Sequence, residues 1–366
     1  MSLFQAVEMA PRDPILGLNE QFAADANPKK VNLGVGVYFD DQGKLPLLHC
    51  VKQAEAQLAA APKARGYLPI DGIAAYDQAV KALVFGAQSE PVQSGRVATV
   101  QALGGTGGLK IGADFLKRLN PNAKVLISDP SWENHKALFT QAGFVVETYT
   151  YYKSETRSID FNGMLTSLNS APPGTVVVLH AYQGFGQGIA EDGAVIAKFV
   201  AAGIDFLVST SFSKSFSLYG ERVGALSALC SSKDEADRVL SQLKIAIRTN
   251  YSNPPTHGGT VVATVLNTPE LRTQWEKELA EMRVRIKAMR SALVDGLKAA
   301  GVKQDMSFIT QQVGMFSYSG LSKDQMVRLR NEFGVYGTDT GRMCVAALNS
   351  GNIQHVCQSI AKVISR

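Results

Sequence analysis

Short apolar runs alternate with helix-like segments between about residues 70 and 180, and no other feature constrains the fold as strongly. A helix is predicted over 73–85, and a glycine-rich turn then opens a second helix that extends to about Leu119. The predicted strands cover 97–101, 124–127, 144–150 and 176–179. Strands and helices that alternate in this way form a mostly parallel sheet covered by helices. The sequence therefore predicts an α/β fold with functional groups at the carboxyl ends of its strands.

The rest of the chain indicates a second, smaller domain. Apolar residues recur every three or four positions from Leu271 to Leu297, which predicts one long helix that joins the two domains. The other predicted helices cover 48–60, 323–333 and 353–364, and the other predicted strands cover 315–318 and 343–347. We expect an arm over 1–14, a small α+β domain over 15–47 and 301–366, a large domain over 48–270 and a connecting helix over 271–300.

The composition is that of an ordinary globular protein. Of 366 residues, 45% are apolar and 19% are charged, and the net charge is +5. The basic residues are scattered, so no nucleic-acid partner is expected. The four cysteines lack metal-ligand spacing, and no metal site is expected. The N-terminus lacks a signal-peptide pattern and no apolar run is long enough to span a membrane, so a cytoplasmic location without membrane attachment is expected.

Lys214 is the candidate for covalent chemistry. It follows the apolar run 204–209, which is predicted to be a short buried strand. A lysine amine in such a loop can form a Schiff base with a carbonyl, and pyridoxal phosphate (PLP) is the commonest partner of this kind. The motif alone also fits a surface lysine in a serine-rich loop. Ser211-x-x-Lys214 resembles a serine acyl-enzyme motif as well, but the accompanying Ser-Asp-Asn and Lys-Thr-Gly motifs do not occur in the chain.

Groups suited to the cofactor's phosphate surround this lysine in the sequence. Arg222 follows eight residues later, and a guanidinium binds phosphate oxygens in bidentate fashion. Ser211 and Ser213 offer hydroxyl donors. The turn 104–108 leads into a helix N-terminus, where backbone N–H groups and the helix dipole favour an anion. Alone, that turn fits a tight turn equally well; beside Lys214 and Arg222, a phosphate site is the better interpretation.

Other polar and aromatic residues are weaker candidates. Arg342 precedes a predicted strand and Arg248 begins a turn-rich segment, so either could bind a carboxylate, although most arginines are simply exposed. Trp132 could stack on a flat ring or serve as a packing residue. Tyr67 and Tyr182 could donate hydrogen bonds or be turn aromatics.

These separate features coincide in one family. The chain resembles the fold-type I PLP-dependent aminotransferases of the aspartate and aromatic amino acid subgroup, and most closely the bacterial aromatic amino acid aminotransferases. The resemblance covers nearly the whole length. The most specific stretches are Val31-Asn-Leu-Gly-Val-Gly-Val-Tyr38, Asp129-Pro-Ser-Trp-Glu-Asn-His135, Ser211-Phe-Ser-Lys214 through Glu221-Arg-Val-Gly224, and 248–255.

The resemblance implies a role for each candidate. Lys214 forms the Schiff base and moves the Cα proton. Trp132 stacks on the cofactor ring, Arg342 binds the substrate α-carboxylate, and the backbone near Gly36 lines the substrate pocket. The residues implied to bind the cofactor's phosphate are Gly105, Thr106, Ser211 and Arg222. Tyr67 is implied to reach the same phosphate from a partner subunit. Tyr182 is implied to bind the ring's 3′ oxygen. The family is a homodimer, in which Arg248 from the other subunit meets the distal carboxylate of a dicarboxylic substrate.

One stretch departs from the family pattern. After His180 the family continues with Asn-Pro-Thr-Gly, a helix, and a strand that ends in aspartate, whereas here Ala181-Tyr182 follow at once. About thirty residues, one βα unit, are absent. With them go the asparagine at the 3′ oxygen and the aspartate that keeps the ring nitrogen protonated, which leaves His135 without its expected carboxylate neighbour. Either the molecule contains a segment that this sequence lacks, which we favour, or the loss is real.

The resemblance implies transamination between aromatic amino acids, together with aspartate, and 2-oxoglutarate as the amino acceptor. Its partners would then be amino acids and 2-oxo acids. If the loss after His180 is real, the alternative is a non-catalytic or impaired relative of the same fold. A third alternative keeps PLP but changes the reaction to a decarboxylation or an elimination. Two arginines suited to carboxylates favour transamination over that alternative.

Overall fold

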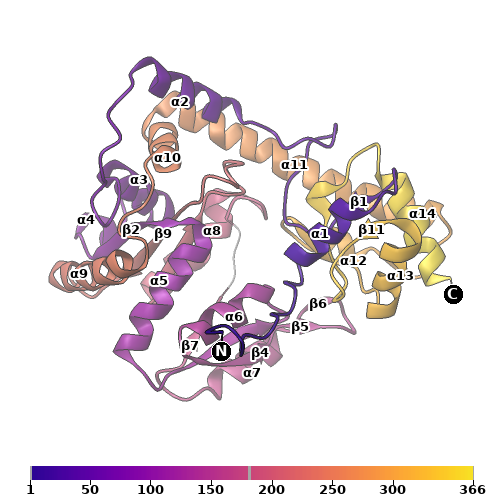
Figure 1. The fold of residues 1–366 in the computed structure, drawn as a ribbon, viewed down its shortest axis with the longest axis horizontal. Coiled ribbons are helices and arrows are strands. Elements are labelled where there is room, and N and C mark those ends of the chain that lie inside the picture. The colour runs from indigo at the N-terminus through magenta and orange to yellow at the C-terminus, as the bar shows by residue number, and fades with distance from the viewer. Residues whose placement is uncertain (1, 180–182, 366) are drawn as a thin grey trace. The chain divides into compact units, whose positions relative to one another are not determined.

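The computed structural model describes residues 2–179 and 183–365. Contacts divide the chain into two compact units (Figure 1). The larger unit is Pro46–Val284, and the smaller unit combines Met1–Leu45 with Arg285–Arg366. The boundary falls within the long helix α11, Pro269–Ala299, which agrees with the single helix predicted from its apolar period.

Two three-stranded sheets form the centre of the larger unit. In the first, β9 (Val223–Leu229) lies between β2 (Val97–Leu103) and β8 (Leu207–Ser211) and is antiparallel to both. Val97 faces Leu229 and Leu103 faces Val223 in that register. In the second, β3 (Lys124–Asp129) lies between β4 (Val145–Thr150) and β7 (Val176–Val177), and all three are parallel. A short hairpin, β5 (Tyr152–Lys153) with β6 (Ser158–Ile159), follows β4.

Two helices of the larger unit, α7 and α9, begin at side-chain caps. The Ser232 side chain accepts a hydrogen bond from the Glu235 N–H and caps α9, and Asp160 caps α7 in the same way. The helices of this unit besides α11 are α2 His49–Ala60, α3 Ala74–Phe85, α4 Glu90–Gln93, α5 Gly104–Leu119, α6 Glu133–Gln141, α7 Phe161–Asn169, α8 Ile189–Ala201, α9 Lys233–Asn250 and α10 His257–Asn267.

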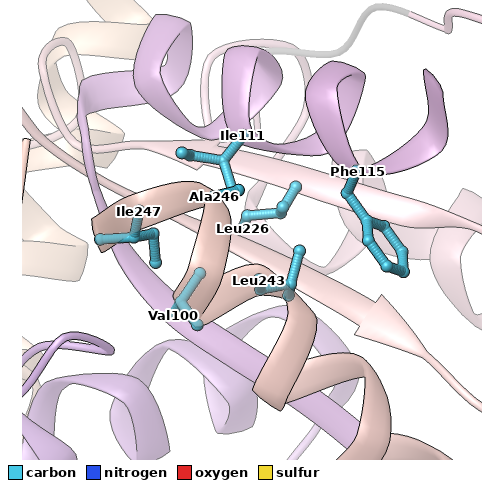
Figure 2. Close-up of a cluster of buried hydrophobic side chains, with 7 residues drawn as sticks. All are labelled: Val100, Ile111, Phe115, Leu226, Leu243, Ala246 and Ile247. Atoms are coloured by element: carbon cyan, nitrogen blue, oxygen red, sulfur yellow. The ribbon is translucent and has the colours of Figure 1, made fainter. Parts of the chain in front are cut away.

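Helix α5 packs against both sheets and so connects them. Ile111 and Phe115 of α5 join a buried cluster with side chains of β2, β9 and α9, and Figure 2 shows these side chains converging (Val100, Ile111, Phe115, Leu226, Leu243, Ala246 and Ile247). Ala113, from the same helix, belongs to a second cluster with Val125 and Ile127 of β3. Because α5 begins directly after β2 and its middle packs in both clusters, the place of its first turn is set by β2 and by this core.

The smaller unit is built from short strand pairs and helices. β1 (Val31–Asn32) pairs in parallel with β11 (Val335–Tyr336), and β10 (Phe316–Tyr318) pairs antiparallel with β12 (Arg342–Cys344). A capping box at Ser322 begins α13, and Gly334 ends it with a φ of 69°. The helices of this unit besides α11 are α1 Leu16–Ala24, α12 Phe308–Gln311, α13 Lys323–Phe333, the 3-10 turn Val345–Ala347 and α14 Ile353–Ile364.

Most predicted elements are confirmed, and several differ. The strand predicted over 176–179 ends at Val177, and the strand predicted over 97–101 in a mostly parallel sheet instead pairs antiparallel with β9. The glycines of 104–108 are already the first turn of α5 rather than a turn before it. The strand predicted over 343–347 ends at Cys344 and tightens into a 3-10 turn. The buried strand predicted over 204–209 lies instead over 207–211 and is only half-buried, because among the described strands β8 pairs with β9 alone and follows its register.

Candidate active site

The first turn of α5 and the loop after β8 form a polar cradle in the larger unit. The Gly104 N–H donates to the Arg222 carbonyl oxygen at 3.0 Å. The Arg222 Nη1 donates to the Ser213 Oγ at 3.1 Å and to the Tyr219 carbonyl oxygen at 2.9 Å. We call Gly104, Gly105, Ser211, Ser213 and Arg222 the anion cradle. It combines a cation, hydroxyl groups and the start of a helix, where backbone N–H groups lack partners within the helix itself.

Glycines allow the serines of β8 to approach this helix start. A Cβ on Gly105 would lie 3.1 Å from the Ser211 Cβ, and a Cβ on Gly108 would lie 2.5 Å from the Ser209 Oγ. Ser209 Oγ also donates to the Gly105 carbonyl oxygen at 2.8 Å. The cradle is therefore lined by backbone and small hydroxyl groups, which suits the close approach of a phosphate to backbone N–H groups.

Buried aromatic rings hold the segment that carries Lys214. Phe212 and Phe216, each 1% exposed, pack edge to face with ring centroids 5.2 Å apart. Phe216 also stacks on Trp275 of α11 at 4.8 Å, and the Trp275 indole N–H donates to the Ser215 carbonyl oxygen at 2.7 Å. Lys214 itself is half-buried, with its Nζ 4.8 Å from the centre of the Tyr219 ring. The lysine side chain is therefore attached to a backbone segment that buried aromatic rings hold in place.

The loop that bears Lys214 contains two non-glycine residues in the left-handed region. Ser217 has a φ of 52° and Arg222 a φ of 54°. Such conformations are uncommon for residues with a β-carbon, and they persist where the surrounding structure fixes them. These two residues turn the chain within the loop that connects β8 to β9. Lys214 and Arg222 both belong to this loop, and Arg222 lies against the first turn of α5.

Trp132 and His135 lie at the start of α6, which follows β3. Trp132 is the residue that precedes the helix, and its ring packs edge to face on His135 with centroids 5.2 Å apart. His135 is buried, and its Nδ1 lies 2.8 Å from the Ser131 Oγ. The buried imidazole, expected from the resemblance to face a carboxylate, therefore contacts a serine of its own turn.

Arg342 and Gly36 meet in the smaller unit, around the ring of Phe316. The Arg342 guanidinium lies 4.6 Å from the centre of that ring and donates to the Gly34 carbonyl oxygen at 3.1 Å. A Cβ on Gly36 would lie 2.6 Å from the Phe316 Cζ. Arg342 is 7% exposed, so its guanidinium is held in one place by its neighbours and has little contact with solvent.

The remaining predicted residues are distributed differently. Tyr67 is 96% exposed in the segment between α2 and α3. Arg248 is exposed near the end of α9, where its Nη1 donates to the Ser252 Oγ. Thr106 lies in the first turn of α5. Tyr182 lies outside the described residues.

Three residues that contact the predicted ones, two in the larger unit and one in the smaller unit, were not predicted from the sequence. Ser209 contacts the cradle, Tyr219 lies beside Lys214, and Phe316 supports Arg342. Ser209 could have been found, because it lies two residues before Ser211 and so shares its face of the strand. Tyr219 and Phe316 carry no motif, and only the folded geometry identifies them.

Comparison with known proteins defines the class of this fold and site. The model of the family described as aminotransferase class I and II matches residues 28–182 and 180–360. The chain belongs to this family.

The particular relatives are aspartate and aromatic amino acid aminotransferases. The chain is 56% identical to the aspartate aminotransferase of Pseudomonas aeruginosa, over all of both chains. It is 45% identical to the aromatic-amino-acid aminotransferase of Escherichia coli, over 99% of this chain and 100% of the relative. The crystal structure of the aromatic-amino-acid aminotransferase from Burkholderia pseudomallei covalently bound to pyridoxal phosphate matches with a TM-score of 0.96 and 58% identity, over 99% of this chain and 100% of that chain.

The same comparisons bear on the segment that is absent after His180. The alignment with the Pseudomonas aeruginosa relative extends over 398 positions, which is 32 more than the 366 residues of this chain. The two parts of the family match meet at residues 180–182. Of the described residues, those of β7 pair only with β3 and those of β8 only with β9, so each sheet ends in an edge strand at this point of the chain.

Proposed function

We propose that this chain is a PLP-dependent aminotransferase that transfers amino groups between aromatic amino acids or aspartate and 2-oxoglutarate. The observation that supports this most strongly is the position of Lys214 on the same short loop as the arginine of the anion cradle. A lysine amine and a phosphate site held by one loop suit a cofactor that has an aldehyde at one end and a phosphate at the other.

The residues present fit the phosphate of this cofactor. Gly104, Gly105 and Gly108 each lie where a β-carbon would contact Arg222, Ser211 or Ser209 too closely. The helix that starts here has 16 residues, so its N-terminus carries the full partial positive charge of a helix end. Gly105, Thr106, Ser211 and Arg222 would hold the phosphate, and Trp132 would cover the ring.

The chain's own residues then act on the substrate. When bound, PLP supplies an electron sink for the carbanion formed at Cα. Lys214 Nζ holds and moves the Cα proton, and its aromatic support keeps the amine in place. Arg342 binds the α-carboxylate, because a fixed guanidinium offers two parallel donors to it. The ring of Phe316, packed against Gly36, lies under that guanidinium.

The site is completed by a second copy of the chain in this proposal. Tyr67 and Arg248 are exposed on segments of the larger unit, which suits residues that serve the site of a partner subunit. Arg248 would pair with the distal carboxylate of aspartate or 2-oxoglutarate and move aside for an aromatic ring. We infer a homodimer in the cytoplasm. Among the described residues, no helix is both long and apolar enough to cross a bilayer.

The experiment that tests the function compares Lys214→Ala with the unchanged protein. We expect the variant to lose the visible absorbance of lysine-bound PLP and all turnover of phenylalanine, tyrosine and aspartate with 2-oxoglutarate. Lys233→Ala is the matched control, because Lys233 is an exposed lysine of α9 that pairs with Asp237. Activity retained in Lys214→Ala would refute the proposal. A wild-type protein that binds no PLP would favour the non-catalytic alternative.

A further inference from the structure

Gln101 of β2 contacts the two segments that lead to Tyr67 and Arg248. Its side chain is 2% exposed. Its backbone N–H donates to the Asp71 carbonyl oxygen at 2.8 Å, and its Oε1 accepts from the Ile73 N–H at 3.1 Å. On the other side, its Nε2 donates to the Pro255 carbonyl oxygen at 3.0 Å. One amide group therefore uses its acceptor for the first segment and its donor for the second.

Each of these segments connects two helices and contains, or directly follows, one residue of the proposed dimeric site. The first segment, 61–73, links α2 to α3 and contains Tyr67. The second segment, 251–256, links α9 to α10 and directly follows the last turn of α9, which contains Arg248. Gln101 itself lies three residues before Gly104, where the anion cradle begins. The strand that ends at the cradle thus holds both segments.

The Gln101 side chain is packed closely against Gly72 of the first segment and against Gly259 in the first turn of α10, which follows the second segment. A Cβ on Gly72 would lie 2.4 Å from the Gln101 Cβ, and a Cβ on Gly259 would lie 2.4 Å from its Nε2. Ile70 of the first segment and Tyr251 of the second pack on the cluster that contains Val100. The Gln101 amide therefore bonds to two segments that also pack their apolar side chains on the same buried cluster.

We propose that Gln101 is a positioning residue that fixes the segments of Tyr67 and Arg248 relative to the anion cradle. The proposal rests on the proposed function for its effect on substrates. Arg248 would act on the distal carboxylate alone, so loss of its placement affects dicarboxylic substrates more than monocarboxylic ones. Because a carboxylate cannot donate, Gln101→Glu replaces the hydrogen bond to Pro255 with a repulsion between two oxygen atoms.

The test measures two properties of Gln101→Glu in the PLP-loaded protein. We expect KM for aspartate and 2-oxoglutarate to rise about tenfold, which corresponds to about 1.4 kcal/mol of lost binding. The change in KM for phenylalanine should be smaller. We also expect trypsin to cut faster after Lys63 or Arg65 in the first segment. Gln101→Met removes both side-chain hydrogen bonds without adding charge and provides a second test if Gln101→Glu fails to fold.

Thr99→Val is the matched control. Thr99 lies on the same strand and is buried, but its Oγ1 bonds to the Ser227 Oγ of β9 rather than to a loop. Cleavage rates and KM values for the Gln101 variants that match those of Thr99→Val would overturn the proposal. Failure of the unchanged protein to transaminate would refute the proposed function instead, and the trypsin measurement would still decide whether Gln101 holds the two segments.

Discussion

Arg222 and Gly104 are packed so closely that a β-carbon on Gly104 would lie 2.5 Å from the Nη2 of the guanidinium. Gly104 also has a φ of 68°, which L side chains rarely adopt. The same residue therefore starts α5 and leaves space for the arginine of the anion cradle. A side chain here must displace either the helix start or the guanidinium.

Replacement of Gly104 by alanine is predicted to weaken PLP binding by about tenfold or more, because either Arg222 or the helix start must move out of the anion cradle. It should also lower the free energy of unfolding by about 1 to 3 kcal/mol, because of the left-handed backbone. PLP titration and chemical denaturation measure the two effects. Gly220→Ala is the control in the Lys214 loop, since a Cβ there meets nothing within 4 Å. Equal PLP affinity in the two variants would contradict the assignment.

Arg342→Lys is predicted to raise KM for both the amino acid and the oxo acid by about tenfold or more, because lysine keeps the charge but loses the paired donors. Steady-state kinetics with phenylalanine and with 2-oxoglutarate provide the measurement. Arg285→Lys is the control, because that arginine also lies over an aromatic ring, Tyr38, in the smaller unit and has no proposed role in the site. The assignment of Arg342 fails if its variant keeps both KM values.

Glu278→Gln is predicted to lower the free energy of unfolding by about 1 to 2 kcal/mol, measured by chemical denaturation. Glu278 of α11 is buried and accepts hydrogen bonds from the N–H groups of His49, at 2.6 Å, and Cys50, at 3.1 Å. It thereby caps the N-terminus of α2 with a negative charge, which the helix dipole stabilises. Glu281→Gln, on the exposed side of the same helix, should change stability little. A loss of equal size in both variants would rule out this capping role.

The sequence predicted most helices well because their apolar period and capping residues are local. Helix α13 matches its predicted span, since Ser322 and Gly334 mark its ends. The Lys214 loop and the anion cradle were also predictable, because Lys214, Ser211 and Arg222 are close in sequence and the glycine turn directly follows a strand.

What escaped prediction depends on contacts between distant residues. Gln101 has no motif, yet it bonds to Ile73 and Pro255. The strand order is likewise set by pairing: β9 inserts between β2 and β8 and runs antiparallel to both, which no local pattern reveals. Phe316 supports Arg342 from a strand 26 residues earlier in the chain, so its role is visible only once β10 pairs with β12.

Asp77→Asn is predicted to remove a pH dependence of stability. Asp77 is buried, its Oδ1 has no hydrogen-bond partner among the described residues, and burial together with Asp71 raises its pKa to about 8. The unfolded pKa is about 3.9, so the folded protein binds more protons between these values. The free energy of unfolding therefore falls as pH rises from about 4 to 8.

Denaturation at several pH values tests this expectation. At pH 8 the Asp77→Asn variant should be more stable than the unchanged protein by at least about 1 kcal/mol, and the two should converge near pH 4 to 5. Asp237→Asn, which alters an exposed carboxylate on α9, should leave the slope unchanged. Parallel pH profiles for the Asp77 variant and the unchanged protein would show that Asp77 ionises normally in the fold.

Restoring a βα segment after His180 is predicted to stabilise the larger unit and to tighten PLP binding by about tenfold. The segment is taken from the Pseudomonas aeruginosa relative, whose alignment exceeds this chain by 32 positions. A strand inserted there can pair with both β7 and β8, whose outer edges have no strand partner among the described residues. It would cover Val177 and Ile204, now 38% and 44% exposed. The resemblance implies that its last strand also ends in the aspartate expected at the ring nitrogen.

A linker of glycine and serine with the same length is the control, because it restores chain length but neither strand pairing nor the carboxylate. The thermal midpoint and the PLP dissociation constant are measured for both insertions and for the unchanged chain. An intact mass of 39.3 kDa first establishes that the starting protein consists of these 366 residues and contains no further segment after His180. If the linker and the βα segment give equal stability and PLP affinity, the two edge strands do not require a strand between them, and the absent unit has no part in binding the cofactor.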